Sequence, residues 1–184
     1  MDFACLDLIN SEQWDGFGRR TDHLEDTAWV EQFLTRWGLA QTLGSEQLDV
    51  GQLVELRALL RRMVEDIERK GQPSNEDMAA FNAVLKAVPV YRQLARQDDI
   101  YQVFLKPLSS DNNSLLAEIA DSTAELLTQY NWRRVKVCRN DGCRWAFYDE
   151  TRGNNRRWCN DLTCGNRDKV RRFRARRKKA RSNT

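Results

Sequence analysis

The sequence predicts a mainly α-helical protein in two parts: a helical N-terminal domain with a short β-hairpin, and a small C-terminal module of a β-hairpin and a basic helix built around four cysteines. Three observations support this prediction. Apolar residues recur at helical spacing through most of the chain before residue 132. Four of the five cysteines fall within the 27 residues from 138 to 164. The charge changes sign near residue 132, so we expect domains at 1–132 and 133–184.

The two parts carry opposite charge. Residues 1–132 hold 12 Lys/Arg and 22 Asp/Glu, a net charge of −10, whereas residues 133–184 hold 18 Lys/Arg and 5 Asp/Glu, a net charge of +13. The basic part would attract polyanions, which suggests a binding module attached to a body with another task. No apolar run approaches the ~20 residues that span a bilayer, and the N-terminus lacks the basic region of a signal peptide. We therefore expect a cytoplasmic protein.

Four segments of the body carry apolar stripes at helical spacing. They are residues 26–39, 52–70, 74–88 and 116–130. Gly38, Gly71 and Pro89 end the first three, and Ser45 and Ser74 are candidate N-caps for the second and third. In the second segment the charged side chains lie off the apolar stripe: Arg57, Arg61, Arg62, Glu65 and Glu68. Such stripes pack a common core more often than they bind a cofactor.

A β-hairpin and several polar residues complete the body. Residues 90–96 and 100–105 flank a short polar turn, and this pattern predicts a hairpin. Asp7, Asn10 and Asp22 lie near apolar segments and could line a ligand pocket, although caps and turns explain them more simply.

The C-terminal cysteines have the spacing of a metal site. Cys138-x4-Cys143 and Cys159-x4-Cys164 are separated by a 15-residue spacer. Two local turns that each supply two thiolates suit the tetrahedral coordination of zinc, so we predict that these four residues bind one zinc ion. Disulfides and unrelated free thiols are the alternatives, but a cytosolic chain disfavours disulfides. Cys5 stands alone.

The spacer itself favours a metal. Residues 144–149 and 156–158 read as two short strands joined by a turn at 151–155. A hairpin this small has little core of its own, and structural zinc contributes roughly 10–16 kcal/mol to such peptides. Four cysteines close the coordination shell and leave no position for a reactive water, so we expect a structural zinc. The sole histidine, His23, is expected at the surface or in a cap.

These residues resemble a known family. Cys138-Arg-Asn-Asp-Gly-Cys143, the following aromatic residues, and above all Cys164-Gly165-Asn166-Arg167 before a basic helix are similar to the CGNR zinc finger. That module usually follows a helical ABATE domain, described as a stress-induced transcription regulator. The opening Leu6-Asp7-Leu8-Ile9-Asn10 and the later Asp22-x-Leu24 are similar to that domain. The resemblance implies four zinc-binding cysteines, DNA binding and no catalytic residue.

The chain after Cys164 reads as a basic helix. Residues 165–184 hold ten basic residues and one acid, Asp168. We expect Val170 and Phe173 to pack against the zinc hairpin. The basic stripe and its neighbours are the candidate nucleic-acid contacts: Asn166, Arg167, Lys169, Arg171, Arg172, Arg174, Arg176, Arg177 and Lys178. Like charges at i, i+4 repel by about 0.2–0.5 kcal/mol per pair, so the C-terminal half should fray until it meets a polyanion. A solvated tail and an anionic membrane surface are the alternatives.

Aromatic residues of the finger allow two interpretations. Trp145, Phe147, Tyr148 and Trp158 either form the core of the zinc module or stack on bases, as in single-strand binders. If two of them were exposed beside arginines, RNA or single-stranded nucleic acid would be favoured over duplex DNA.

These features together predict a bacterial-type, zinc-dependent DNA-binding transcription regulator whose body senses an effector or dimerises. Arginines would contact phosphates, and Asn166 and Arg167 would read bases. An RNA-binding or ribosome-associated factor is the alternative. We expect no enzyme activity, because the sequence shows no nucleophile–base pair and no phosphate-binding glycine loop.

Overall fold

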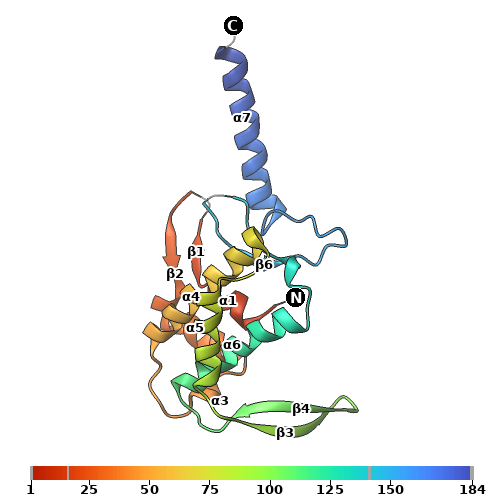
Figure 1. The fold of residues 1–184 in the computed structure, drawn as a ribbon. Coiled ribbons are helices and arrows are strands. Elements are labelled where there is room, and N and C mark those ends of the chain that lie inside the picture. The colour runs from red at the N-terminus through yellow and green to blue at the C-terminus, as the bar shows by residue number, and fades with distance from the viewer. Residues whose placement is uncertain (1, 16, 141, 183–184) are drawn as a thin grey trace.

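The computed structural model describes residues 2–15, 17–140 and 142–182. A helical body joins a small cysteine-bearing unit, as predicted, and one long helix projects away from both (Figure 1). The helices of the body are α1 (Ala4–Asn10), α2 (Thr27–Arg36), α3 (Ala40–Leu43), α4 (Val50–Lys70), α5 (Asn75–Lys86) and α6 (Asn112–Thr128), with a 3-10 turn η1 (His23–Glu25). Within the described residues, none of the helices combines the length and apolar character needed to cross a bilayer.

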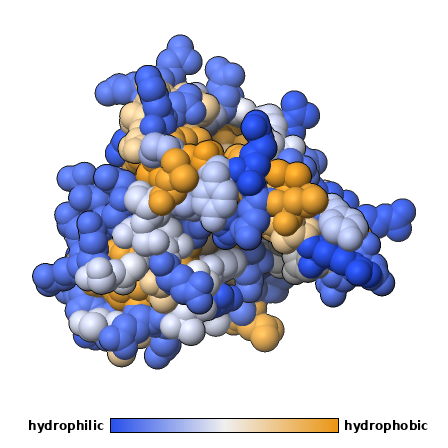
Figure 2. All heavy atoms as spheres, turned by 90° about the horizontal axis from the view of Figure 1, so that it is seen from below, coloured by the Kyte–Doolittle hydropathy of each residue, from blue (hydrophilic) through white to orange (hydrophobic). Residues whose placement is uncertain are grey.

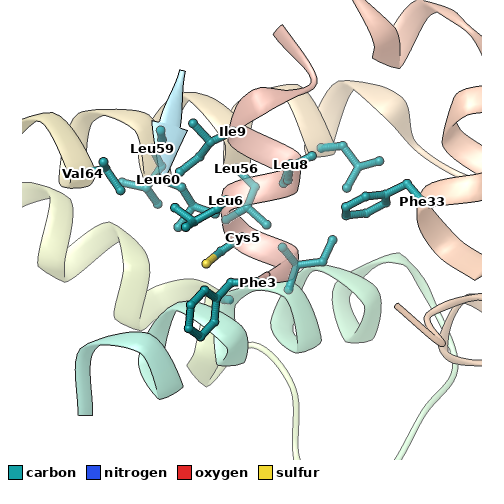
Figure 3. Close-up of a cluster of buried hydrophobic side chains, with 14 of the residues drawn as sticks. Phe3, Cys5, Leu6, Leu8, Ile9, Phe33, Leu56, Leu59, Leu60 and Val64 are labelled. Atoms are coloured by element: carbon teal, nitrogen blue, oxygen red, sulfur yellow. The ribbon is translucent and has the colours of Figure 1, made fainter. Parts of the chain in front are cut away.

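The helix α1 lies at the centre of the body, although it is not among the predicted helices. Its buried side chains include Cys5, Leu8 and Ile9, each at most 1% exposed. They meet Leu56 and Leu60 of α4 in one apolar cluster (Figure 3). A short helix that is covered on most sides has no polar stripe to reveal its period, so pattern reading misses it.

The other body helices follow the apolar stripes, with shifted ends. The helix predicted at 26–39 is present as α2, which ends at Arg36, and the short α3 follows it after residue 39. The side chain of Ser74 caps α5 as predicted and accepts a hydrogen bond from the Asp77 amide at 3.0 Å. The N-cap of α4 is Asp49 and not Ser45, because the helix begins at Val50. Gly71 ends α4 in the left-handed conformation, with φ 81°.

Two arginines of α4 that the apolar pattern places on its polar face are buried. Arg57 and Arg61 are 5% and 7% exposed. Arg57 binds both carboxylate oxygens of Asp22 at 2.5 and 2.7 Å, and Arg61 donates to the carbonyls of Ile9 and Arg144 at 2.6 and 2.9 Å. These two arginines lie off the apolar stripe, as predicted, yet they are buried because α1, the neighbouring hairpin and the finger cover this face of α4.

Two hairpins belong to the body. The strands β1 (Glu12–Trp14) and β2 (Arg20–Asp22) form a pair that the sequence pattern does not predict. The predicted hairpin is present as β3 (Val90–Gln97) and β4 (Ile100–Pro107). Asp98 and Asp99 form its two-residue turn at φ 48° and 65°, as a turn between twisted antiparallel strands requires.

The finger begins with a 3-10 turn, η2 (Trp132–Arg134), and a hairpin that differs from the predicted one. Its strands are β5 (Val135–Val137) and β6 (Ala146–Tyr148), which enclose the first cysteine pair. Residues 156–158 are not a strand, and the Arg157 carbonyl instead accepts the Arg139 amide at 2.9 Å. The prediction missed β5 because three residues are too few to show a period.

The long projecting helix is α7 (Asn166–Ser182), which follows the wide turn η3 (Asp161–Gly165). It starts just after Cys164, as predicted. Val170 and Phe173 do not pack on the zinc hairpin, however, since they are 47% and 54% exposed. The expected packing was wrong because α7 leaves the finger as a rod and touches it mainly at η3 (Figure 1).

Candidate functional site

The four finger cysteines converge on one point. The Sγ atoms of Cys138, Cys143, Cys159 and Cys164 all lie within 4.8 Å of one another. Those of Cys143 and Cys159 are 3.6 Å apart, and those of Cys159 and Cys164 are 3.7 Å apart. These separations far exceed the ~2.05 Å of a disulfide. Tetrahedral zinc with ~2.3 Å Zn–S bonds places its sulfurs about 3.8 Å apart, so the cluster fits one zinc ion.

The closeness of the four sulfurs also favours a bound cation. Hydrogen bonds from the Cys143 and Cys159 thiols lower the pKa of Cys138 to about 2, and the shared hydrogen bond with Cys138 raises the pKa of Cys143 to about 12. Sulfurs this close cannot all ionise without a compensating positive charge. A zinc ion would supply that charge and hold all four as thiolates. The Asn140 amide donates to the Cys164 sulfur at 3.4 Å, which is the kind of outer contact that orients a ligand.

Arg156 positions the second cysteine pair. Its guanidinium lies 4.5 Å from the centre of the Phe147 ring and donates to the Trp158 carbonyl at 2.9 Å and to the Cys159 carbonyl. The Arg156 amide donates to Asp149 at 2.9 Å. One side chain therefore fixes the backbone around Cys159 through both its charge and its plane.

A buried carboxylate organises the loop between the two cysteine pairs. Asp149 is fully buried and accepts hydrogen bonds from Lys136 Nζ at 2.6 Å and from the Thr151 amide and hydroxyl at 2.9 and 2.6 Å. Burial alone would raise the pKa of Asp149, but these hydrogen bonds outweigh it and hold the pKa well below its usual range. Lys136 also donates to the Asn154 carbonyl at 2.8 Å, so the buried pair is satisfied on both sides.

The finger aromatics are core residues. Phe147 is buried beside the cysteines, and Trp145 and Trp158 pack against the same cluster. Tyr148 turns the other way and packs on Phe3 of the body, with ring centres 5.8 Å apart. None of these four is among the exposed residues, so the core interpretation is confirmed for Trp145, Phe147 and Trp158, whereas Tyr148 belongs to the core of the body.

The turn that carries Cys164 also starts α7. The Asn160 side chain accepts hydrogen bonds from the Leu162 and Thr163 amides at 2.8 and 3.1 Å. A Cβ at Gly165 would lie 3.3 Å from a carboxylate oxygen of Asp161, so a larger residue there would have to displace this carboxylate. Asn166 donates to the Leu162 carbonyl at 2.9 Å. The base of α7 is therefore held directly against a zinc-binding cysteine.

The first turn of α7 is engaged with the rest of the chain. The Arg167 guanidinium donates to the Asp15 carbonyl and lies 4.6 Å from the centre of the Phe17 ring. Asp168 pairs with Arg171 and Arg172 at 2.9 Å each. Because it reaches the i+3 and i+4 positions at once, this single acid offsets part of the repulsion expected among the arginines of the helix. Asn166 and Arg167, the predicted base readers, are thus occupied by internal contacts.

Beyond this turn, α7 presents its basic side chains to solvent. The exposed residues are Lys169, Arg171, Arg172, Arg174, Arg176, Arg177 and Lys178. The side chains of Lys179 and Arg181, which contribute to the predicted charge, lie outside the described residues. Phe17 and Leu162, 82% and 81% exposed, flank a cavity of about 720 Å³ that Arg171 and Arg174 also line.

Asp7 and Asn10 meet where the body joins the finger. The Asn10 amide donates to the Ala146 carbonyl and accepts the Ala146 amide, both at 2.8 Å. Asp7 accepts the Trp37 indole N–H at 2.9 Å and an Arg36 N–H at 3.3 Å. Both residues line a cavity of about 270 Å³ between α1 and β6. Asn10 pairs with the backbone of Ala146 as a strand would, through both the nitrogen and the oxygen of its side-chain amide.

The other polar residues considered as site candidates have structural contacts. Asp22 caps η1 by accepting the Leu24 amide at 3.1 Å, in addition to its ion pair with Arg57. The His23 ring stacks on Trp29 at a centroid distance of 5.7 Å and is not part of the cysteine cluster. Capping and packing therefore explain both residues.

Comparison with known protein families gives two matches that divide the chain. Residues 2–130 match the ABATE family, whose description is "Putative stress-induced transcription regulator", and residues 134–177 match the CGNR zinc finger. A search of the curated proteins finds no match. The finger match contains all four clustered cysteines and the first part of α7. The chain therefore belongs to the ABATE family and carries a C-terminal CGNR zinc finger with a site for one structural zinc ion.

Proposed function

We propose that this protein is a DNA-binding transcription regulator that acts in the cytoplasm, with α7 as its nucleic-acid-binding element. The observation that carries the proposal is the position of α7. This strongly basic helix starts beside a zinc-binding cysteine and projects from an acidic body. A fixed basic rod can follow a phosphate backbone or enter the major groove. The body's negative charge keeps other surfaces away from the polyanion.

The contacts fall into two groups under this proposal. Lys169, Arg174, Arg176, Arg177 and Lys178 would bind phosphates, because their side chains point into solvent along α7. Arg171 and Arg172 would join them once phosphates compete with Asp168. Asn166 and Arg167 would instead hold the helix base in place and read bases only after leaving their internal partners.

RNA or single-stranded nucleic acid is the second candidate ligand, and one observation favours it. Phe17 is 82% exposed beside Arg167, and Phe173 is 54% exposed with the Arg177 guanidinium 5.7 Å from its ring centre. Exposed aromatic rings beside arginines suit unstacked bases. Competition between duplex DNA and a structured RNA of equal length distinguishes the two ligands.

The body would control the finger. The cavity lined by Asp7 and Asn10 lies between α1 and β6, so an effector bound there would touch both parts of the chain. We propose this cavity as the effector site, with Asp7 as its polar contact. The partners under this model are nucleic acid, a small-molecule effector and a second copy of the chain.

Salt-dependent binding tests the proposed function. Zinc-loaded protein should bind a labelled DNA duplex, and six to ten phosphate contacts predict an affinity loss on the order of 10³–10⁵ between 50 and 200 mM salt. Arg174→Gln should reduce the slope of log affinity against log salt by about 1, whereas the matched control Lys86→Gln on the body should leave it unchanged. Binding without salt dependence, or equal slopes for both variants, would rule the proposal out.

A further inference from the structure

The hairpin β3–β4 has one face made largely of exposed apolar side chains. In the strand register, Arg92 pairs with Leu105, Leu94 with Val103 and Arg96 with Tyr101. Each of these side chains lies on the same face, which we call the outer face. Five of its apolar members are 46–67% exposed: Val90, Leu94, Tyr101, Val103 and Leu105. From this end of the molecule, apolar surface gathers in patches between charged residues (Figure 2).

The opposite face of the hairpin is partly covered by the body. Ala95 and Phe104 on that face are half-buried. Lys106, also on that face, lies 3.8 Å from Glu118 of α6. The outer face stays open to solvent, although Val103 and Leu105 on its β4 side also line a cavity of about 630 Å³ with residues of α1 and α6.

Such a surface is costly in water. A two-stranded hairpin alone is marginally stable, and this one makes few contacts with other elements among the described residues. Exposed strands usually carry charged or polar side chains that prevent association. Here both outer strand edges are unpaired and alternate positions are apolar, which is typical of an interface.

We propose that the outer face of β3–β4 binds the same face of a second copy of this chain. The charges on the face support this occupant. Its two arginines, Arg92 and Arg96, both belong to β3, whereas Tyr101, Val103 and Leu105 of β4 are uncharged. Each copy thus offers a cationic strand and an apolar strand side by side. A two-fold contact can place one on the other. This inference does not depend on nucleic-acid binding.

The pattern also selects the arrangement of the two copies. Stacked sheets lie about 10 Å apart, and two kinds of two-fold axis can relate them. An axis across the strands would place β3 on β3 and bring Arg92 near Arg96 of the second copy. An axis along the strands places β3 on β4, with Arg96 over the ring of Tyr101. The second arrangement exchanges repulsion for a cation–π contact, so we infer this one.

Self-association of the full-length, zinc-loaded protein tests the proposal. Sedimentation velocity over a concentration series should show a monomer–dimer equilibrium. Leu94→Lys should weaken it by about tenfold or more, because a charge would be buried without a partner. Gln93→Lys is the matched control: it adds the same charge at the next exposed position, on the opposite face, and should change the dimer constant by less than about twofold. Unchanged zinc content and circular dichroism would show that both variants fold.

Cross-linking tests the arrangement. Leu94→Cys protein mixed with Val103→Cys protein should give a dimer with a short bismaleimide, while Leu94→Cys alone should give much less. Wild-type protein with the reagent controls for its own cysteines. A wild-type chain that stays monomeric at its highest soluble concentration, or equal effects of Leu94→Lys and Gln93→Lys, would overturn the proposed dimer. Preferential linking of Leu94→Cys to itself would overturn the inferred axis.

Discussion

The body and the finger are stabilised by different means. The body buries apolar helices around α1, with Leu8, Leu53 and Ile119 fully inaccessible. The finger has a small cluster of four cysteines and Phe147, together with the buried pair of Asp149 and Lys136. Where the chain has enough apolar residues, burial suffices; where about 50 residues cannot build such a core, a metal site and satisfied polar groups replace it.

The two parts nevertheless share one surface. Val135 and Ala146 of the finger hairpin belong to the apolar cluster of the body. The Asn10 side chain of α1 both donates to and accepts from the backbone of Ala146. Arg144 also pairs with Glu65 of α4 at 3.0 Å. The finger hairpin should therefore stay packed on the body when the metal is lost. The cysteine loops and the base of α7 should lose their ordered structure.

Loss of the zinc site should have the largest effect, and this effect should be confined to the finger. Cys164→Ser should abolish zinc binding, and the finger loops should lose a stabilisation of roughly 10–16 kcal/mol. Amide hydrogen exchange should then show rapid exchange in residues 138–170 and retained protection in α1 and α4. Cys5→Ala, which removes the buried cysteine of the body, is the control and should keep one zinc per chain. Loss of protection throughout the body in Cys164→Ser would contradict the division.

A smaller effect should be confined to the body. Asp22→Ala leaves the buried Arg57 without its partner, which costs about 3–5 kcal/mol in the free energy of unfolding. Zinc content should not change. The matched control is Asp2→Ala, which removes the exposed partner of Arg36 and should cost less than ~1 kcal/mol. Urea denaturation measures both, and equal costs would be inconsistent with the burial of the Arg57 pair.

In the finger, Asp149→Asn should cost about 3 kcal/mol, because Lys136 loses its charged acceptor. The pKa of Asp149 is lowered in the folded state, so its contribution is complete above the unfolded pKa of about 3.9 and is lost as pH falls through the folded pKa. The difference between wild type and variant should thus be constant from pH 8 to about pH 5. Chemical denaturation at three pH values would show this, and a difference that shrinks within that range would disprove the low pKa.

The contact between body and finger at Asn10 and Ala146, which we call the joint, should show the smallest effect. Asn10→Ala removes two hydrogen bonds to Ala146, which we expect to cost about 2 kcal/mol. Zinc should remain bound, and hydrogen exchange should rise at β6 before it rises in the cysteine loops. Asn113→Ala, an asparagine change in the first turn of α6, serves as the comparison. Zinc loss in Asn10→Ala would mean that the joint also supports the metal site.

Features that depend on local chemistry could be predicted from the sequence. The cysteine spacing indicated the zinc cluster, because both pairs are close in the chain. The turn chemistry of the β3–β4 hairpin and the cap at Ser74 are also local. The basic character of α7 needed only a count of charges.

Features that depend on contacts between distant segments could not be predicted. The burial of Arg61 requires α1 and the finger to cover α4, and no pattern within α4 shows that. Arg167 was expected to face a ligand, but its partners, Asp15 and Phe17, lie far away in the sequence. The exposure of Phe173 was missed because an apolar residue at helical spacing ordinarily indicates packing.

Chelation during DNA binding tests the central claim, that zinc holds α7 in the position where it binds nucleic acid. Reduced, zinc-loaded protein on a labelled duplex would be titrated with a chelator while released metal and fluorescence anisotropy are recorded together. We predict one zinc per chain, with DNA released in proportion to the metal and rebound when zinc is restored. Complete removal of the metal with duplex affinity unchanged would contradict the account.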